Sequence, residues 1–286
     1  MRAVIMIYNN HMLQIRRQLK EKLKNPLFKN ITLTNVLVLF LLPLFAVVIS
    51  SIFHPTFFTS FLLFLGLPAL YISCRAPKYI LKSALFSLIA GIPLMIILEY
   101  IGGFSAAWAF PPSLFSFAIM GRVSVEVLLW AFLNIYTIVI FYEYLFDNHI
   151  KVRVWNKKMW ALIRYLLVWV ILFVLVLIFS SQPLVVPYFY LVFGLVIFIF
   201  PIAMMWLYYP RNLPKITLSL FYFTYLSFLY EIVALMNGWW YFPGTEFIGY
   251  VSFGDISFPI EEFVFWIILF APAVISAFEY LDDDLR

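Results

Sequence analysis

The residues in this sequence that are best suited to chemistry are glutamates placed within or beside long apolar segments. Glu99 and Glu231 each stand about two helical turns before an apolar segment ends, and Glu261 and Glu262 form a doublet shortly after Pro259. A charged side chain inside a bilayer costs several kcal/mol unless it is paired or hydrated, so carboxyl groups there are candidates for function. Two structural roles compete with this one. A carboxyl group can hydrogen-bond a Trp or Tyr to fix a loop, and acids in the first turn after a proline stabilise a helix N-terminus.

Aromatic residues crowd the sequence around these acids. Helical spacing predicts that Phe265 lies over Glu261 and that Trp266 lies over its neighbour Glu262. Neighbouring rings exclude water from a carboxyl group, and a second acid close by disfavours a second negative charge, so both favour the protonated form. A protonated carboxyl group can act as a general acid. Aromatic faces attract cations. A neutral acid beside such rings therefore suits a reaction that protonates an alkene and stabilises the carbocation that results. Interfacial aromatic belts without catalytic duty are the alternative. The predicted substrate-binding residues are Trp239, Trp240, Tyr241, Phe265, Trp266, Trp108 and Trp130.

The chain contains an internal repeat. Residues 99–111 match residues 231–243 without a gap, at an offset of 132 residues, and the matched positions include Glu, Trp, Phe and Pro. After four additional residues in the second copy, the match continues at an offset of 136, which sets Glu126 opposite Glu262. This register leaves Glu261 without an acidic counterpart. Glu261 is therefore the first candidate for a proton donor, and Glu126 completes the acidic set.

Apolar segments long enough to cross a membrane must position these residues. Apolar residues make up 65% of the chain and charged residues 12%, which excludes an ordinary soluble fold. A stretch containing Gly66 and Pro68 is short, which predicts a kink or a tilt. Four crossings in each copy predict an all-α integral membrane protein of about eight transmembrane helices in two parallel four-helix repeats. Because about 20 apolar residues span the hydrocarbon core, the predicted crossings are 31–53, 57–73, 79–101, 122–146, 159–181, 187–208, 215–236 and 260–280.

Lys and Arg collect in every second loop, which orients the chain. Residues 1–30 hold seven of them and one acid, and residues 148–158 hold four more. Short basic loops stay on the cytoplasmic side, so we expect a multi-pass protein of the cell membrane with both termini cytoplasmic. The basic residues then face anionic lipid headgroups rather than nucleic acid. The predicted parts are a basic amphipathic segment at 1–30, a first repeat at 31–147, a basic linker at 148–158 and a second repeat at 159–286.

No arrangement of metal ligands or phosphate-binding residues is evident. The chain has one cysteine, Cys74, which excludes an internal disulfide, and its three histidines are scattered. Asp147 and the acids at 282–284 lie at predicted cytoplasmic helix ends, where a solvated acidic tail fits better than a cation site. There is no Gly-rich phosphate loop and no Asp-rich pair of the kind that holds a prenyl diphosphate. We therefore expect no cofactor and no metal.

The residues around the glutamate doublet resemble a known family. The segment Phe-Pro-Ile-Glu-Glu-Phe at 258–263, preceded by Gly-Trp-Trp-Tyr at 238–241, is similar to the Pro-x-Glu-Glu/Asp motif of membrane-bound lycopene cyclase domains. The resemblance covers roughly residues 35–284. It implies cofactor-independent cyclisation of the ends of an acyclic carotenoid. On this resemblance Glu261 or Glu262 supplies the catalytic proton and Glu231 assists. The residues that it implies for charge stabilisation are Trp240, Phe265 and Trp266.

Three other functions fit the same residues. In a carotenoid hydratase, water would capture the same cation, and product mass would distinguish it because cyclisation yields an isomer. A proton-coupled transporter would also use intramembrane carboxyl groups between parallel repeats, although few Gly or Pro residues interrupt the third and fourth helices of each copy. A structural assembly factor needs no chemistry. For either enzyme the partner is a lipophilic polyene or isoprenoid, and the sequence leaves the oligomeric state open.

Overall fold

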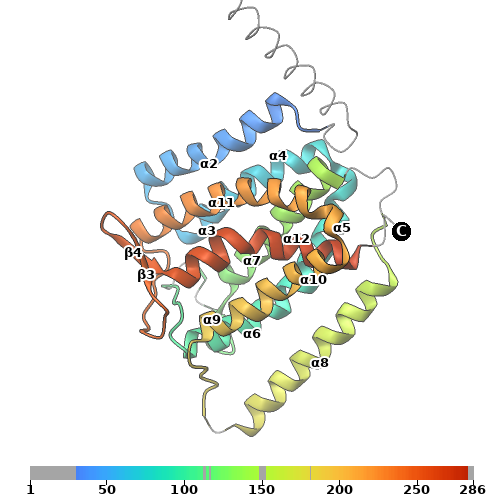
Figure 1. The fold of residues 1–286 in the computed structure, drawn as a ribbon. Coiled ribbons are helices and arrows are strands. Elements are labelled where there is room, and N and C mark those ends of the chain that lie inside the picture. Colours follow the sequence, from blue (N-terminus) through green and yellow to red (C-terminus); the bar gives the residue numbers. More distant parts are fainter. Residues whose placement is uncertain (1–29, 112–113, 116, 148–152, 181, 283–286) are drawn as a thin grey trace, which may run out of the picture.

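The computed structural model describes residues 30–111, 114–115, 117–147, 153–180 and 182–282. In this part of the chain, eight helices are long and apolar enough to cross a membrane, which confirms the predicted class of helical membrane protein (Figure 1). The predicted surface segment at 1–30 and the first half of the linker lie outside the described residues, apart from Asn30. The eight helices are Leu33–Phe53, Phe57–Arg75, Pro77–Phe104, Val125–Asp147, Lys157–Phe179, Phe189–Tyr208, Pro210–Met236 and Glu262–Leu281.

Short polar residues set where several of these helices begin. The side-chain oxygens of Thr32, Thr56, Ser124 and Asn156 each accept a hydrogen bond from a backbone N–H two or three residues ahead. Such caps satisfy N–H groups that have no partner within the helix. They start α2 (Leu33–Phe53), α3 (Phe57–Phe61), α7 (Val125–Tyr142) and α8 (Lys157–Phe179).

Three crossings contain a π-helical turn just before a proline. The turns are η2 (Leu62–Gly66), η4 (Ser87–Gly91) and η6 (Leu195–Ile199), and Pro68, Pro93 and Pro201 follow them. A proline inside a helix removes a hydrogen bond and clashes with the carbonyl four residues earlier, and a wider turn accommodates both effects. The irregularity predicted at Gly66 and Pro68 is therefore a local widening. The flanking helices are α4 (Leu67–Arg75), α5 (Ile80–Phe86), α6 (Ile92–Phe104), α9 (Phe189–Gly194) and α10 (Phe200–Tyr208).

Two helices form the centre of the bundle. They are α7, continued by η5 (Glu143–Asp147), and α12 (Phe270–Leu281), which is preceded by η8 (Glu262–Leu269). α7 packs against α4, α5, α6 and α12, and α12 also packs against α10 and α11 (Leu213–Met236). On the outside, α2 runs along α11, and α8 contacts α6 at the edge of the molecule (Figure 1).

Two short β-hairpins, which the sequence analysis did not predict, lie at one end of the bundle. β1 (Ala118–Ile119) pairs with β2 (Val123–Ser124), and β3 (Tyr250–Phe253) pairs with β4 (Ile256–Pro259), both antiparallel. Gly254 has a φ of +61° in the turn between β3 and β4, a conformation that favours glycine. Each hairpin leads directly into a central helix, so its position sets where α7 and η8 begin. We call this end of the bundle the hairpin end.

Candidate functional site

Two carboxyl–indole pairs hold the loops at the hairpin end. Trp108 Nε1 donates to Glu99 Oε2 at 2.8 Å, and Trp240 Nε1 donates to Glu231 Oε1 at 3.0 Å. All four side chains are buried. In each pair the indole lies nine residues after the glutamate, so the loop folds back over the end of its own helix. The structural role considered for these glutamates is therefore present in both halves of the chain.

The two loops are also joined to each other. Ala109 and Tyr241 exchange two backbone hydrogen bonds, with N–O distances of 2.9 and 3.0 Å, and form an isolated antiparallel bridge. Each of these residues directly follows one of the paired tryptophans. The bridge therefore fixes the two indoles relative to each other.

Glu126 and Glu261 perform the same structural task. Each is the second residue of its helix, and each is almost fully buried. Glu126 Oε1 accepts a hydrogen bond from the backbone N–H of Leu114, and Glu261 Oε1 accepts one from the backbone N–H of Ile248, both at 2.7 Å. Both carboxyl groups therefore hold the loop that precedes their helix.

This geometry differs by one residue from the register that sequence matching predicted. The sequence set Glu126 opposite Glu262, whereas the hydrogen bonds place Glu126 and Glu261 in equivalent positions. The reason is the π-helical turn η8, because a π turn takes up one additional residue and moves every later residue by one position. The acid without a counterpart in the first half is therefore Glu262.

A cavity between the central helices is lined by two of the acidic candidates. The volume of this cavity is about 50 Å³. Glu262 and Glu231 line it, together with four of the predicted substrate-binding residues, Trp108, Trp130, Trp240 and Trp266. Both acids are buried, so neither carboxyl group of this pair faces open solvent. The further lining residues are Leu65, Met95, Phe110, Asn134, Tyr190, Leu226, Ser227, Tyr230, Phe242 and Ile267.

Several predicted site residues lie outside this cavity. Trp239 is buried, but its Nε1 donates to the backbone oxygen of Pro55. Tyr241 is half exposed and contributes its backbone to the bridge between the loops. Phe265 packs against Gly194, whose lack of a side chain leaves room for the ring. Glu99, Glu126 and Glu261 are the acidic candidates that do not line the cavity.

Tyr190 is a site residue that the sequence analysis missed. Its hydroxyl donates a hydrogen bond to Glu262 Oε2, and its ring lies 5.1 Å from that of Trp108. Tyr190 belongs to α9, which is 72 residues before Glu262 in the chain. In the sequence it is one aromatic residue among many in an apolar segment, so no local signal distinguishes it.

The two acids in the cavity have no cationic partner among the described residues. None of the ion pairs in that part of the chain involves Glu231 or Glu262. A buried carboxylate without a compensating charge costs several kcal/mol. The cavity therefore favours the neutral acid form of both side chains, which is the form that can donate a proton.

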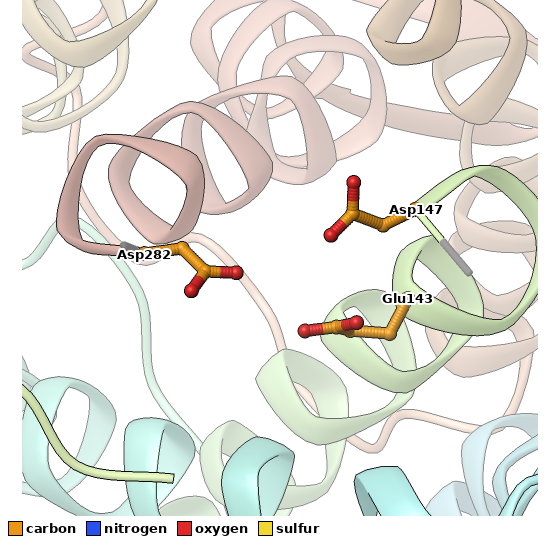
Figure 2. Close-up of side chains that lie close together, drawn as sticks. All are labelled: Glu143, Asp147 and Asp282. Atoms are coloured by element: carbon orange, nitrogen blue, oxygen red, sulfur yellow. The ribbon is translucent and has the colours of Figure 1, made fainter. Parts of the chain in front are cut away.

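A second group of buried acids lies at the opposite end of the bundle. Figure 2 shows Glu143 and Asp147, from the end of the α7–η5 helix, turned toward Asp282 at the end of α12. Lys82 Nζ lies 2.6 Å from both Glu143 Oε1 and Asp282 Oδ2, and Lys215 Nζ lies 3.3 Å from Asp147 Oδ1. The prediction that Asp147 and Asp282 are solvated is wrong, because both are buried in this ion-pair network.

The same network has the geometry of a possible cation site. Carboxyl oxygens of Glu143, Asp147 and Asp282 lie within 4.8 Å of one another, close enough to share a metal ion. Lys82 already brings a positive charge to two of them. The lysines therefore account for the clustering of these carboxyl groups. The acids at 283–284 lie outside the described residues.

Comparison of the chain with protein-family models, with curated proteins and with solved structures found no match.

Proposed function

We propose that this protein is a cofactor-independent membrane enzyme that cyclises the ends of an acyclic isoprenoid polyene, as the resemblance to lycopene cyclases implies. The observation that carries the proposal is Glu262, a buried acid in a cavity walled by aromatic rings, with no counterpart in the first half of the chain. Indoles from both halves surround the same space, and their faces stabilise positive charge. Glu231 lines the cavity as a second acid.

The proposed reaction begins with proton transfer from the Glu262 carboxylic acid to the terminal double bond of the polyene. A new C–H bond forms, and the adjacent tertiary carbon becomes a cation. The π electrons of a nearby double bond then attack this carbon, which closes the ring and moves the cation to a ring carbon. Loss of a proton from the neighbouring carbon to the Glu262 carboxylate forms the ring alkene and restores the acid. The product is an isomer of the substrate, so no oxidant, reductant or co-substrate is consumed.

Tyr190 and the carboxyl–indole pair have positioning roles in this proposal. The Tyr190 hydroxyl donates to one oxygen of Glu262, which orients the carboxyl group and leaves its second oxygen to carry the proton. The bond from Trp240 Nε1 to Glu231 holds the indole against the cavity. Preorganised groups of this kind lower the cost of reaching the transition state.

We also propose that two copies of a four-helix unit build the site around a twofold axis along the membrane normal. Ala109 and Tyr241, which form the bridge, are matched residues at the repeat offset of 132. The rings of Trp130 and Trp266, matched at an offset of 136, lie 5.4 Å apart. Residues on a twofold axis contact their own counterparts. The packing of α2 on α11 and of α8 on α6 is reciprocal in the same way and supports this arrangement.

The orientation of the protein is a further part of the proposal. The basic loops favour a cytoplasmic position for both termini and for the buried ion-pair network. The hairpin end then faces away from the cytoplasm, and the cavity lies near that membrane surface. We place the protein in the cell membrane, where a polyene substrate dissolves in the surrounding lipid.

Expression of the chain in lycopene-accumulating bacteria tests the proposed activity. We expect chromatography of the pigments to show cyclised isomers, and Glu262→Gln to abolish them while the protein is still inserted in the membrane. Glu261→Gln is the matched comparison, because a glutamine oxygen can still accept the N–H of Ile248, so we expect its turnover to persist. Unchanged lycopene with the natural chain would refute lycopene as the substrate. Full turnover in Glu262→Gln would refute Glu262 as the proton donor.

A further inference from the structure

Two polar side chains in the cavity wall have no hydrogen-bond partner in the part of the chain that the structure describes. Trp130 and Asn134 stand four residues apart on α7, which places them on one face of that helix, and both line the cavity. Trp130 Nε1 is buried, and Asn134 is only 7% exposed. Within the described residues, neither the indole N–H nor the amide of Asn134 makes a hydrogen bond.

The absence of a partner is unusual for an indole N–H buried as deeply as that of Trp130. Most buried polar side chains in folded proteins bond to the protein, to water or to a ligand, and an unpaired one destabilises the fold. Two other tryptophans that line the cavity are paired, Trp108 with Glu99 and Trp240 with Glu231. A purely hydrocarbon occupant of the cavity would leave both Trp130 and Asn134 unsatisfied.

The chemistry of these two side chains defines the group that would satisfy them. An indole N–H only donates, whereas an amide both donates and accepts. A single oxygen that carries a hydrogen can accept from Trp130 and either donate to or accept from Asn134. We propose that Trp130 and Asn134 form a binding site for one O–H oxygen inside the cavity. This inference rests on the proposed function in one respect: the site lies in the cavity that is proposed to hold the reacting polyene.

This oxygen can have two sources. A water molecule held there lies in the same cavity as the carbocation. Its oxygen can bond to the cationic carbon and pass one proton to the Glu262 carboxylate, so that a tertiary alcohol forms and the substrate gains one water. Alternatively, the oxygen is a hydroxyl group carried by the isoprenoid itself, and the site selects a hydroxylated substrate. Both sources use the same two side chains.

A binding experiment tests the site without requiring turnover. The purified full chain is heated with farnesol or with farnesene, which have similar carbon chains and differ in the hydroxyl group. If the hydroxyl group is the ligand, farnesol stabilises the natural chain more than farnesene does. Asn134→Leu and Trp130→Phe then each weaken the apparent affinity for farnesol by about 5- to 10-fold, the effect of one neutral hydrogen bond. Trp160→Phe, at an exposed position on α8, leaves the preference unchanged.

Pigment analysis of the same variants distinguishes water as the source. If water is bound, the natural chain yields, beside the cyclised isomer, a product one water heavier than lycopene, and Asn134→Leu lowers the ratio of hydrated product to isomer at least 10-fold. Should Asn134→Leu fail to insert, Trp130→Phe carries both tests. Equal stabilisation by farnesol and farnesene, together with products free of added water, would overturn the inference even if lycopene is cyclised. A farnesol preference that depends on Asn134, without conversion of any polyene, would support the site and refute the proposed reaction.

Discussion

Removal of the Lys82 ammonium is expected to destabilise the protein strongly. Lys82 Nζ lies 2.6 Å from both Glu143 and Asp282, and the three side chains are at most 6% exposed. At an effective dielectric constant of about 20, each contact corresponds to roughly 6 kcal/mol of attraction, much of which offsets the cost of removing the charges from water. Lys82→Met leaves two buried carboxyl groups without that cation, and losing one partner of a buried pair typically costs about 3–5 kcal/mol.

Thermal unfolding of the detergent-purified chain, followed by size-exclusion chromatography of the remaining folded fraction, measures this effect. We expect the midpoint for Lys82→Met to fall by roughly 6–20 °C. Lys157→Met removes an exposed lysine at the start of α8 and should shift the midpoint little. Adding Glu143→Gln to Lys82→Met should recover part of the loss, because one of the two uncompensated carboxyl groups is then neutral. A midpoint for Lys82→Met equal to that of Lys157→Met would refute the assigned role of the ion-pair network.

Three further predictions concern close packing and orientation. Gly194→Ala would place a Cβ 2.2 Å from Cδ2 of Phe265, so we expect a loss of about 1–3 kcal/mol in thermal unfolding. Gly102→Ala would place a Cβ 2.5 Å from Cζ2 of Trp108; because that indole lines the cavity, the pigment assay should show reduced conversion. The exposed Cys74 should react with a membrane-impermeant maleimide in inside-out vesicles and not in intact cells.

Matched variants control two of these experiments. Gly103→Ala would meet the flexible side chain of Arg122, whose Nε lies 2.9 Å from the added Cβ, so it should reduce conversion less than Gly102→Ala. Ser252→Cys in a Cys74→Ser background places a thiol on the hairpin end and should label from the opposite side. Equal conversion by the two glycine variants would contradict the proposed role of the Trp108 position. Labelling of Cys74 in intact cells would reverse the proposed orientation, and an unchanged midpoint for Gly194→Ala would contradict the packing at Phe265.

The positions of the helices and the importance of the acidic and aromatic residues could be predicted from the sequence. Crossing a bilayer depends on the length of an apolar segment, which is a local property, and so all eight crossings were predicted close to their observed bounds. Glu231, Trp240 and Trp266 were identified for a similar reason, since acidic residues and clustered aromatics are conspicuous in apolar surroundings. The paired glutamates and tryptophans also indicated a repeat, although not its register around Glu262.

Which residues share the cavity was decided by the tertiary structure. Glu262 lines the cavity, whereas Glu261, one residue earlier, is bonded to a loop, because neighbouring residues on a helix point in different directions and the packing of the helix decides which of them faces the cavity. Tyr190 reaches Glu262 across 72 residues of chain. Lys82 reaches Asp282 across 200 residues of chain. Asp282, which the sequence placed in a solvated acidic tail, therefore belongs to a buried ion pair. Contacts between distant segments depend on how the helices pack, and no local pattern records that packing.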